Sequence, residues 1–235
     1  MPIYAYCGNN PLYYTDPSGL DPVTEEEFGY LKLIAGSLAK LARSGRISDV
    51  EALAGTVEAI VKYSGSEPND VDDFMSAFTR LLSAWIWDPV WYDAFNVRYN
   101  TEYVSNFGDE GFKKDYQEPR PRGQTLDPND VASRNQVTHF VGYVTAGYIG
   151  PLLVADCYCY YREIRLQRGT TDGADYLLGL VAIDVGAALK RYRDQDEFGV
   201  GTFHFDLPCP LCGNTFCNGL APNQLADWIR NNLGE

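Results

Sequence analysis

The sequence predicts a mainly α-helical fold, preceded by a β-hairpin and followed by a cysteine-rich C-terminal extension. Two stretches begin with Ser or Thr three residues before Glu, the capping box that opens many helices. A third stretch carries apolar side chains at helical spacing, and three more apolar stretches are separated by Gly-Pro and Gly-Thr-Thr-Asp. We therefore expect a helical bundle and, after it, an antiparallel cluster of three apolar helices.

The bundle is expected from three helices that lie close together in the chain. Thr24 and Glu27 form the first capping box, and Ser48 and Glu51 form the second. The third helix is expected over about 69–85, where apolar residues follow helical spacing. Nothing in these three helices indicates chemistry, so we expect them to be a scaffold or an element for translocation and immunity-protein binding.

The apolar cluster is expected after a long polar loop over 98–130. Its helices are predicted over about 132–150, 151–167 and 173–193, and a short amphipathic helix beginning near Pro222 ends the chain. Glycine disfavours a helix by about 1 kcal/mol relative to alanine, so repeated small residues favour close backbone approach between helices. The small residues that repeat every four positions in the first of these helices are Gly142, Ala146 and Gly150.

The charge of the chain argues against nucleic-acid binding. Its net charge is -13, from 32 acidic and 19 basic residues, whereas proteins that bind phosphate backbones need a basic surface. No charged residue lies between Arg134 and Asp156, a run long enough to span a bilayer. The glycines and Pro151 in this run favour a pair of buried helices, and insertion into a membrane is the alternative.

The N-terminal stretch "YAYCGNNPLYYTDPSGL" predicts a β-hairpin. Its GNNP and TDPSGL segments are strong turn signals, and the aromatic LYYT between them favours a short strand. Two strands alone are marginally stable in water, so this hairpin is expected to belong to a larger sheet. The chain therefore begins with residues that read like the end of another domain.

The same stretch resembles the closing segment of the Rhs repeat-associated core, with its Y-x-Y-x-x-N-x-P and D-P-x-G-L patterns. In that family the segment ends a large β-cage, and the second pattern marks the border, commonly the self-cleavage point, before a variable toxin or effector domain. The resemblance implies an organisation of 1–20 as the end of the core, 21–97 as an N-terminal helical part and 98–235 as the effector domain. The border residues would be Asp16, Pro17, Gly19 and Leu20.

The resemblance also implies partners and a location. An Rhs-type effector domain is carried by its upstream core cage, serves in bacterial competition and is neutralised by a cognate immunity protein. The first twenty residues lack the basic start and apolar centre of a signal peptide, so secretion or delivery into a target cell is expected as part of a larger Rhs protein.

Candidate catalytic residues lie in the apolar cluster, where polar side chains are few. Asn135 and His139 are four residues apart and share one helix face. Glu163 and Asp175 lie on the two helices that follow, and a histidine beside carboxylates can act as a general base or a metal ligand. A core histidine that a carboxylate merely neutralises is the structural alternative. The segments also resemble uncharacterised helical domains behind Rhs cores, which supports grouping these four residues as one site.

A second candidate site is the segment "HFDLPCPLCGNTFC". His204, Cys209, Cys212 and Cys217 could bind one structural Zn²⁺ tetrahedrally. Disulfides, including pairs with the other cysteines, and free thiols remain open alternatives. No other cofactor motif occurs, because the chain has no Gly-rich phosphate-binding loop.

Three functions follow from these observations. The first is a toxin domain that acts as a hydrolase, with His139 as base or metal ligand, Glu163 and Asp175 orienting it or activating water, and Asn135 positioning the substrate or the imidazole. The second is a membrane-active, pore-forming toxin that uses the uncharged run. The third is a non-catalytic binding module stabilised by zinc or a disulfide.

Overall fold

The computed structural model describes residues 23–82, 108–117, 136–160, 173–195 and 219–235, which form a mainly helical fold as the sequence predicted. The predicted hairpin, the border residues and the cysteine-rich extension lie outside these ranges. No β-strand occurs in the described ranges, and their single β-bridge joins Phe112 to Gly234. The helices are α1 Glu25–Arg43, α2 Asp49–Ser64, η2 Pro68–Asp70, α3 Val71–Leu82, η4 Lys114–Tyr116, α4 Gln136–Ile149, α5 Leu152–Tyr160, α6 Gly173–Arg193 and α8 Pro222–Asn232.

Both predicted helix starts of the bundle are confirmed at the level of hydrogen bonds. The Thr24 hydroxyl accepts from the Glu27 backbone N–H at 3.2 Å, and the Glu27 carboxylate accepts from the Thr24 N–H at 2.9 Å. Ser48 caps α2 by accepting from the Glu51 N–H at 3.1 Å, whereas the Glu51 carboxylate accepts from Arg230 and the second capping box is only half formed. These bonds satisfy backbone donors that have no partner inside the first turn of a helix.

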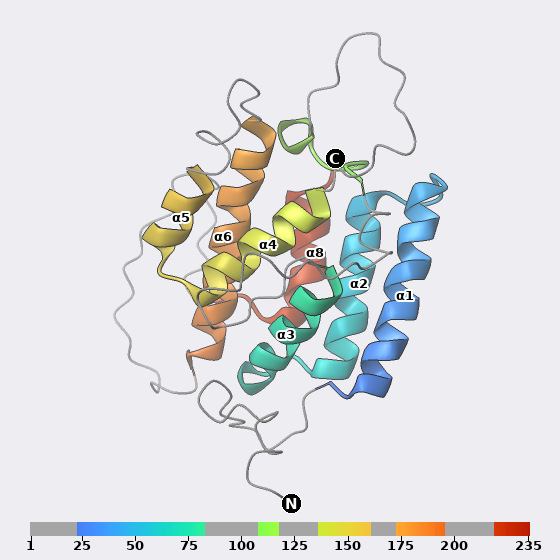
Figure 1. Ribbon diagram of the computed structural model, residues 1–235, viewed down its shortest axis with the longest axis horizontal. Coiled ribbons are helices and arrows are strands. Elements are labelled where there is room, and N and C mark those ends of the chain that lie inside the picture. The colour runs from blue at the N-terminus through green and yellow to red at the C-terminus, as the bar shows by residue number, and fades with distance from the viewer. Residues whose placement is uncertain (1–22, 83–107, 118–135, 161–172, 196–218) are drawn as a thin grey trace, which may run out of the picture.

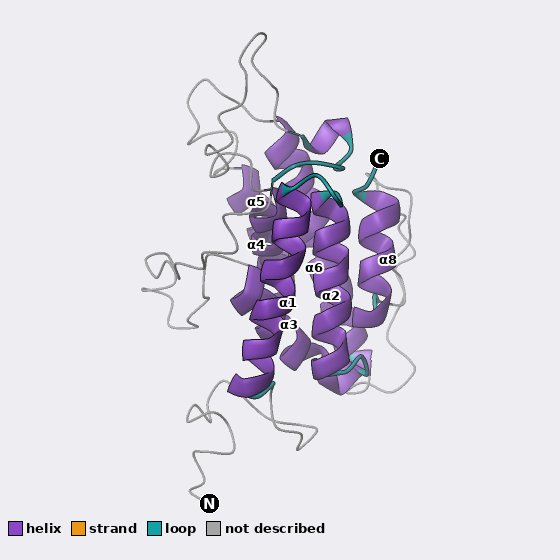
Figure 2. Ribbon diagram, turned by 90° about the vertical axis from the view of Figure 1, so that its right-hand side faces the viewer, coloured by secondary structure: helices purple, strands orange, loops and turns teal. Residues whose placement is uncertain are grey.

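The helices pack in two groups that share one hydrophobic core (Figure 1). α2 lies between α1 and α8, while α4 packs on α6 and α5 covers the outer side of α6. α3 contacts both α2 and α4 and so connects the groups. The view turned by 90° shows α1, α2 and α8 as neighbouring, nearly upright helices (Figure 2).

α4 packs most closely on α6, and the two helices run in the same general direction while crossing obliquely (Figure 1). Gly147 lies against the backbone of Ile183, and Gly186 lies against the carbonyl of Val144. α5, which follows α4 in the chain, runs in the opposite direction. It starts next to the end of α4 and brings Cys159 beside Gly179, near the start of α6. The three helices α4, α5 and α6 therefore alternate in direction as expected. The closest backbone contact is between α4 and α6.

Residues 108–117 connect the start of α2 to the C-terminus. The Lys113 N–H donates to Leu233 O at 2.8 Å, and the Glu235 N–H donates to Gly111 O at 3.0 Å. Asp49, the first residue of α2, is buried and accepts from the Glu110 N–H at 2.8 Å. Part of the stretch expected to be a long polar loop is thus fixed to the helical core.

None of the helices described above is long and apolar enough to cross a membrane.

The glycines between α4 and α6 predict a specific loss of stability. A methyl group at Gly147 would overlap the backbone of Ile183, so Gly147→Ala should lower the free energy of unfolding by about 1–3 kcal/mol. Gly142→Ala is the matched control on α4, because no neighbouring atom lies within 4 Å of a Cβ there. It should raise the free energy of unfolding by about 0.5–1 kcal/mol. Urea denaturation measures both, and equal losses would contradict the close approach.

Asp49 predicts a dependence of stability on pH. Burial raises the pKa of its carboxyl group, so the folded protein binds a proton here more readily than the unfolded chain does. The cost of this buried charge disappears as the pH falls through the raised pKa towards the unfolded value of about 3.9. Relative to Asp49→Asn, the native protein should therefore gain unfolding free energy between about pH 7 and about pH 4. Urea denaturation across this pH range measures the difference in unfolding free energy between the native protein and the variant. A difference that does not change with pH would contradict a raised pKa at Asp49.

Candidate functional site

His139 and Asp175, two of the predicted catalytic residues, lie together in the structure. His139 Nε2 is 3.5 Å from Asp175 Oδ2. His139 is in the first turn of α4 and Asp175 is in the first turn of α6, and these turns are neighbours because the two helices run in the same general direction. The structure thus brings together residues that are distant in the sequence.

Gln136, which sequence reasoning missed, completes this pair. Its Nε2 donates a hydrogen bond to Asp175 Oδ1 at 2.9 Å, and the side chain is fully buried. The Asp175 carboxylate therefore lies between an amide donor and an imidazole, with one oxygen facing each. The sequence could have indicated Gln136 by its spacing, because it precedes His139 by three residues and lies on the same helix face.

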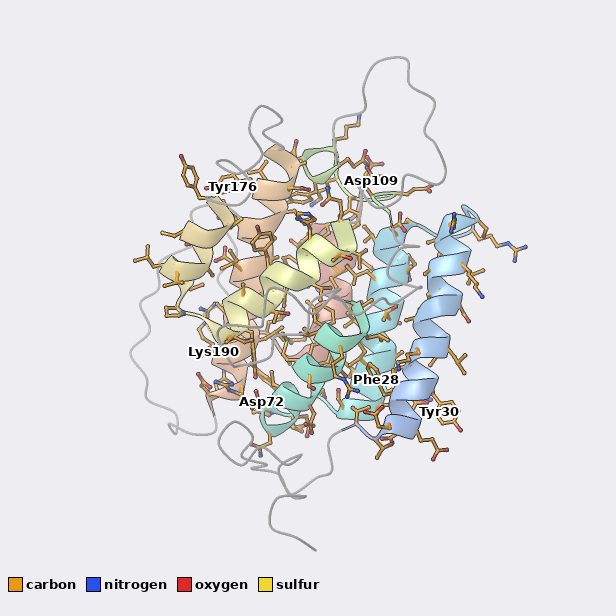
Figure 3. All side chains as sticks on the ribbon, in the orientation of Figure 1. Phe28, Tyr30, Asp72, Asp109, Tyr176 and Lys190 are labelled. Atoms are coloured by element: carbon orange, nitrogen blue, oxygen red, sulfur yellow. The ribbon has the colours of Figure 1, made fainter. Side chains whose placement is uncertain are left out.

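Burial differs sharply between the two members of the pair. The side chain of Asp175 is 6% exposed, whereas that of His139 is 22% exposed. A buried carboxylate needs compensation, which the amide of Gln136 and the positive end of the α6 dipole supply. The basic residues at the end of α6 lie in its last turn, and Figure 3 shows Lys190 far from Tyr176 along the helix.

An aromatic ring lies beside the imidazole. The ring of Tyr143, one turn after His139, has its centroid 6.2 Å from that of the imidazole. Tyr143 and Cys159 both approach Gly179, where a larger side chain would collide with the cysteine sulfur. α5 therefore packs close to the site, and its last residues contact the start of α6 through the T-shaped pair of Tyr160 and Tyr176.

The remaining predicted site residues lie outside the described part of the chain. This holds for Asn135 and Glu163 of the catalytic set and for the whole His-Cys cluster. The described residues contain no group of three or more His, Cys, Asp or Glu side chains placed to hold a metal ion. Away from this pair, desolvation and then the charge of Asp184 on α6 raise the pKa of the Asp156 carboxyl group on α5.

Comparison with known proteins identifies no relative. No family model matches the chain, and no curated protein or solved structure does either.

The arrangement of these side chains is suited to general base catalysis. A neutral imidazole can take a proton from water, and the imidazolium that forms is stabilised by a carboxylate held beside it. Asp175 is held in this way by Gln136, and the side chain of His139 is partly exposed, although Nδ1, the ring nitrogen that does not face Asp175, is buried. The Gln136 Oε1 atom is buried without a hydrogen-bond partner among the described residues, which leaves an acceptor at the site.

The bond between Gln136 and Asp175 predicts a measurable coupling energy. A double-mutant cycle of Gln136→Ala and Asp175→Ala should give about 1.5–3 kcal/mol, because the bond is made to a charged group. The buried hydroxyl pair Thr79 and Thr145, 2.9 Å apart, is the matched neutral control and should give about 0.5–1.5 kcal/mol. Urea denaturation measures both cycles. A coupling near zero for the first pair would mean that Gln136 does not hold the carboxylate.

Proposed function

We propose that this chain is the effector domain of an Rhs-type polymorphic toxin and that it acts as a hydrolase through His139. The observation that carries the enzymatic part is the partly exposed imidazole beside a buried carboxylate. Gln136 fixes the carboxylate with one oxygen towards the imidazole, which supports an orienting role for Asp175. Such a supported pair is the usual form of a general base with an orienting group.

Each side chain has a separate role in this proposal. His139 takes the proton from the attacking water, and Asp175 orients the imidazole and stabilises its charged form. Gln136 fixes the rotamer of Asp175, so that one carboxylate oxygen remains directed to the imidazole. Asn135 and Glu163 keep their proposed roles of positioning the substrate and activating water.

The toxin part of the proposal rests on the opening residues of the chain. The D-P-x-G-L pattern, with Asp16, Pro17, Gly19 and Leu20, would mark the border between a core cage and residues 21–235. The cage and a cognate immunity protein are the partners that this organisation implies, and the domain would be delivered into a target cell. A structural Zn²⁺ at His204, Cys209, Cys212 and Cys217 remains part of the proposal.

A membrane-active toxin is the second candidate, and one observation favours it. Ile149, Leu153 and Val154 are exposed at the corner between α4 and α5, although they belong to the run that has no charged residue. Large exposed apolar side chains that lie together commonly mark a surface of interaction. This candidate differs from the hydrolase because its activity would not depend on His139.

Toxicity in bacteria tests the hydrolase. The full chain is expressed in the cytoplasm and, with a signal peptide, in the periplasm, each as wild type and as His139→Ala. We expect killing in one compartment and a reduction of about a hundredfold or more in the variant, which is the usual contribution of a general base. Asp175→Asn should also reduce killing, because it removes the charge that stabilises the imidazolium.

The matched control for lost stability is Thr145→Val. Thr145 is buried on the same helix as His139 and bonds to Thr79, so the variant loses a buried hydrogen bond without changing the site. It should be destabilised by about 1 kcal/mol and should still kill. Killing that survives His139→Ala would overturn the hydrolase and favour the membrane-active toxin.

A further inference from the structure

α8 contacts α4 through a stacked pair of aromatic rings. The rings of Trp228 and Phe140 are nearly parallel, with an interplanar angle of 16° and centroids 6.3 Å apart. This separation lies in the range that offset aromatic pairs prefer. Figure 1 shows α8 between α4 and α2, so Trp228 extends the packing of α8 from α2 to the first half of α4.

Phe140 lies next to the candidate site on α4. It is fully buried and directly follows His139, which is 3.5 Å from the Asp175 carboxylate. Gln136, which donates to the other oxygen of that carboxylate at 2.9 Å, lies four residues before Phe140 and therefore on the same side of the helix. A displacement of Phe140 would thus move both partners of Asp175.

α8 is well suited to support this part of α4, because it is firmly held on α2. The Arg230 guanidinium donates to both carboxylate oxygens of Glu51 at 2.9 Å and to Glu58 at 2.6 Å. A pair in which two parallel donors meet two oxygens has a defined geometry. Leu225 and Ile229, on the same helix as Trp228, are fully buried in the shared core.

Other contacts fix the second half of α4. The hydroxyl pair of Thr145 and Thr79 is 2.9 Å apart, and Gly147 lies against the backbone of α6. These two contacts lie six and eight residues after His139. Trp228 supplies a contact on the first half of the helix, where the side chains of the candidate site are located.

We propose that Trp228 is a positioning residue for His139. This inference rests on the proposed function and adds a residue of α8 to the site. The indole ring holds Phe140, and with it the first turn of α4, at the distance from α6 at which Gln136 and His139 both reach the Asp175 carboxylate. Trp228 acts through Phe140 and takes no part in proton transfer.

Chemical modification of His139 in the full chain tests this role without an assay of activity. Diethyl pyrocarbonate acylates imidazole nitrogens, and mass spectrometry of the peptide that contains His139 gives the rate. The side chain is 22% exposed and its Nδ1 atom is buried, so the rate depends on how often the first turn of α4 opens. Trp228→Leu should raise the rate about threefold or more.

Phe78→Leu is the matched control for the loss of a stacked ring. Phe78 stacks on Phe74 within α3, at an interplanar angle of 17° and a centroid distance of 5.5 Å. Phe78 is fully buried, whereas Trp228 is half-buried, so the control removes a ring that is at least as important for stability. It should leave the rate of His139 modification near that of the wild type.

Two further variants keep the test decisive. Trp228→Phe retains a ring beside Phe140 and should restore the slow modification of the wild type. Trp228→Met, which has no ring but a long apolar side chain, replaces Trp228→Leu if that variant does not fold. Equal rates of modification in Phe78→Leu and in the variant without a ring would overturn the positioning role, because the indole would then contribute to stability alone.

Killing of bacteria separates this inference from the proposed function. We expect Trp228→Leu to reduce killing about tenfold or more, while Phe78→Leu and Trp228→Phe retain it, because small displacements of a catalytic group are costly. Full killing by Trp228→Leu, in a protein that His139→Ala inactivates, would overturn the positioning role. Killing that survives His139→Ala would instead overturn the hydrolase, and the modification rates would still decide whether Trp228 fixes the start of α4.

Discussion

The close approach of α4 and α6 is the constraint on which the rest of the structure depends. At Gly147 and Gly186 the backbone of one helix lies against the backbone of the other, which no larger side chain would allow. This contact sets the relative alignment of the two helices and places their first turns side by side. His139 and Asp175 meet only because of that alignment, since 35 residues separate them along the chain.

Polar contacts at the opposite end prevent the two helices from sliding. The Tyr148 hydroxyl of α4 donates to Asp72 of α3, and Arg193 of α6 reaches both, at 3.2 Å from Asp72 Oδ1 and 3.1 Å from the Tyr148 hydroxyl. Burial raises the pKa of Tyr148, so the hydroxyl stays protonated and available as a donor. The α4 and α6 pair is therefore fixed by glycine packing in its middle and by this cluster at one end, with the candidate site at the other.

The candidate site combines a buried carboxylate, which is held in place, with an imidazole side chain that is partly exposed. Asp175 is buried and compensated by Gln136 and by the start of α6, so its position is well defined. The side chain of His139 is partly exposed, although its Nδ1 atom is buried. A carboxylate fixed beside an imidazole is the arrangement on which general base catalysis relies.

The sequence by itself determined the helical class, the capped starts of α1 and α2 and the apolar character of α4, α5 and α6, because these depend on local spacing and backbone donors. It also indicated His139 and Asp175, since polar residues stand out in apolar helices. Only the tertiary structure decided that α4 packs most closely on α6, that Gln136 holds Asp175, and that the outer face of α5 is exposed. Periodicity says which residues share a face of one helix, whereas the choice of partner depends on packing between helices, which local spacing does not encode.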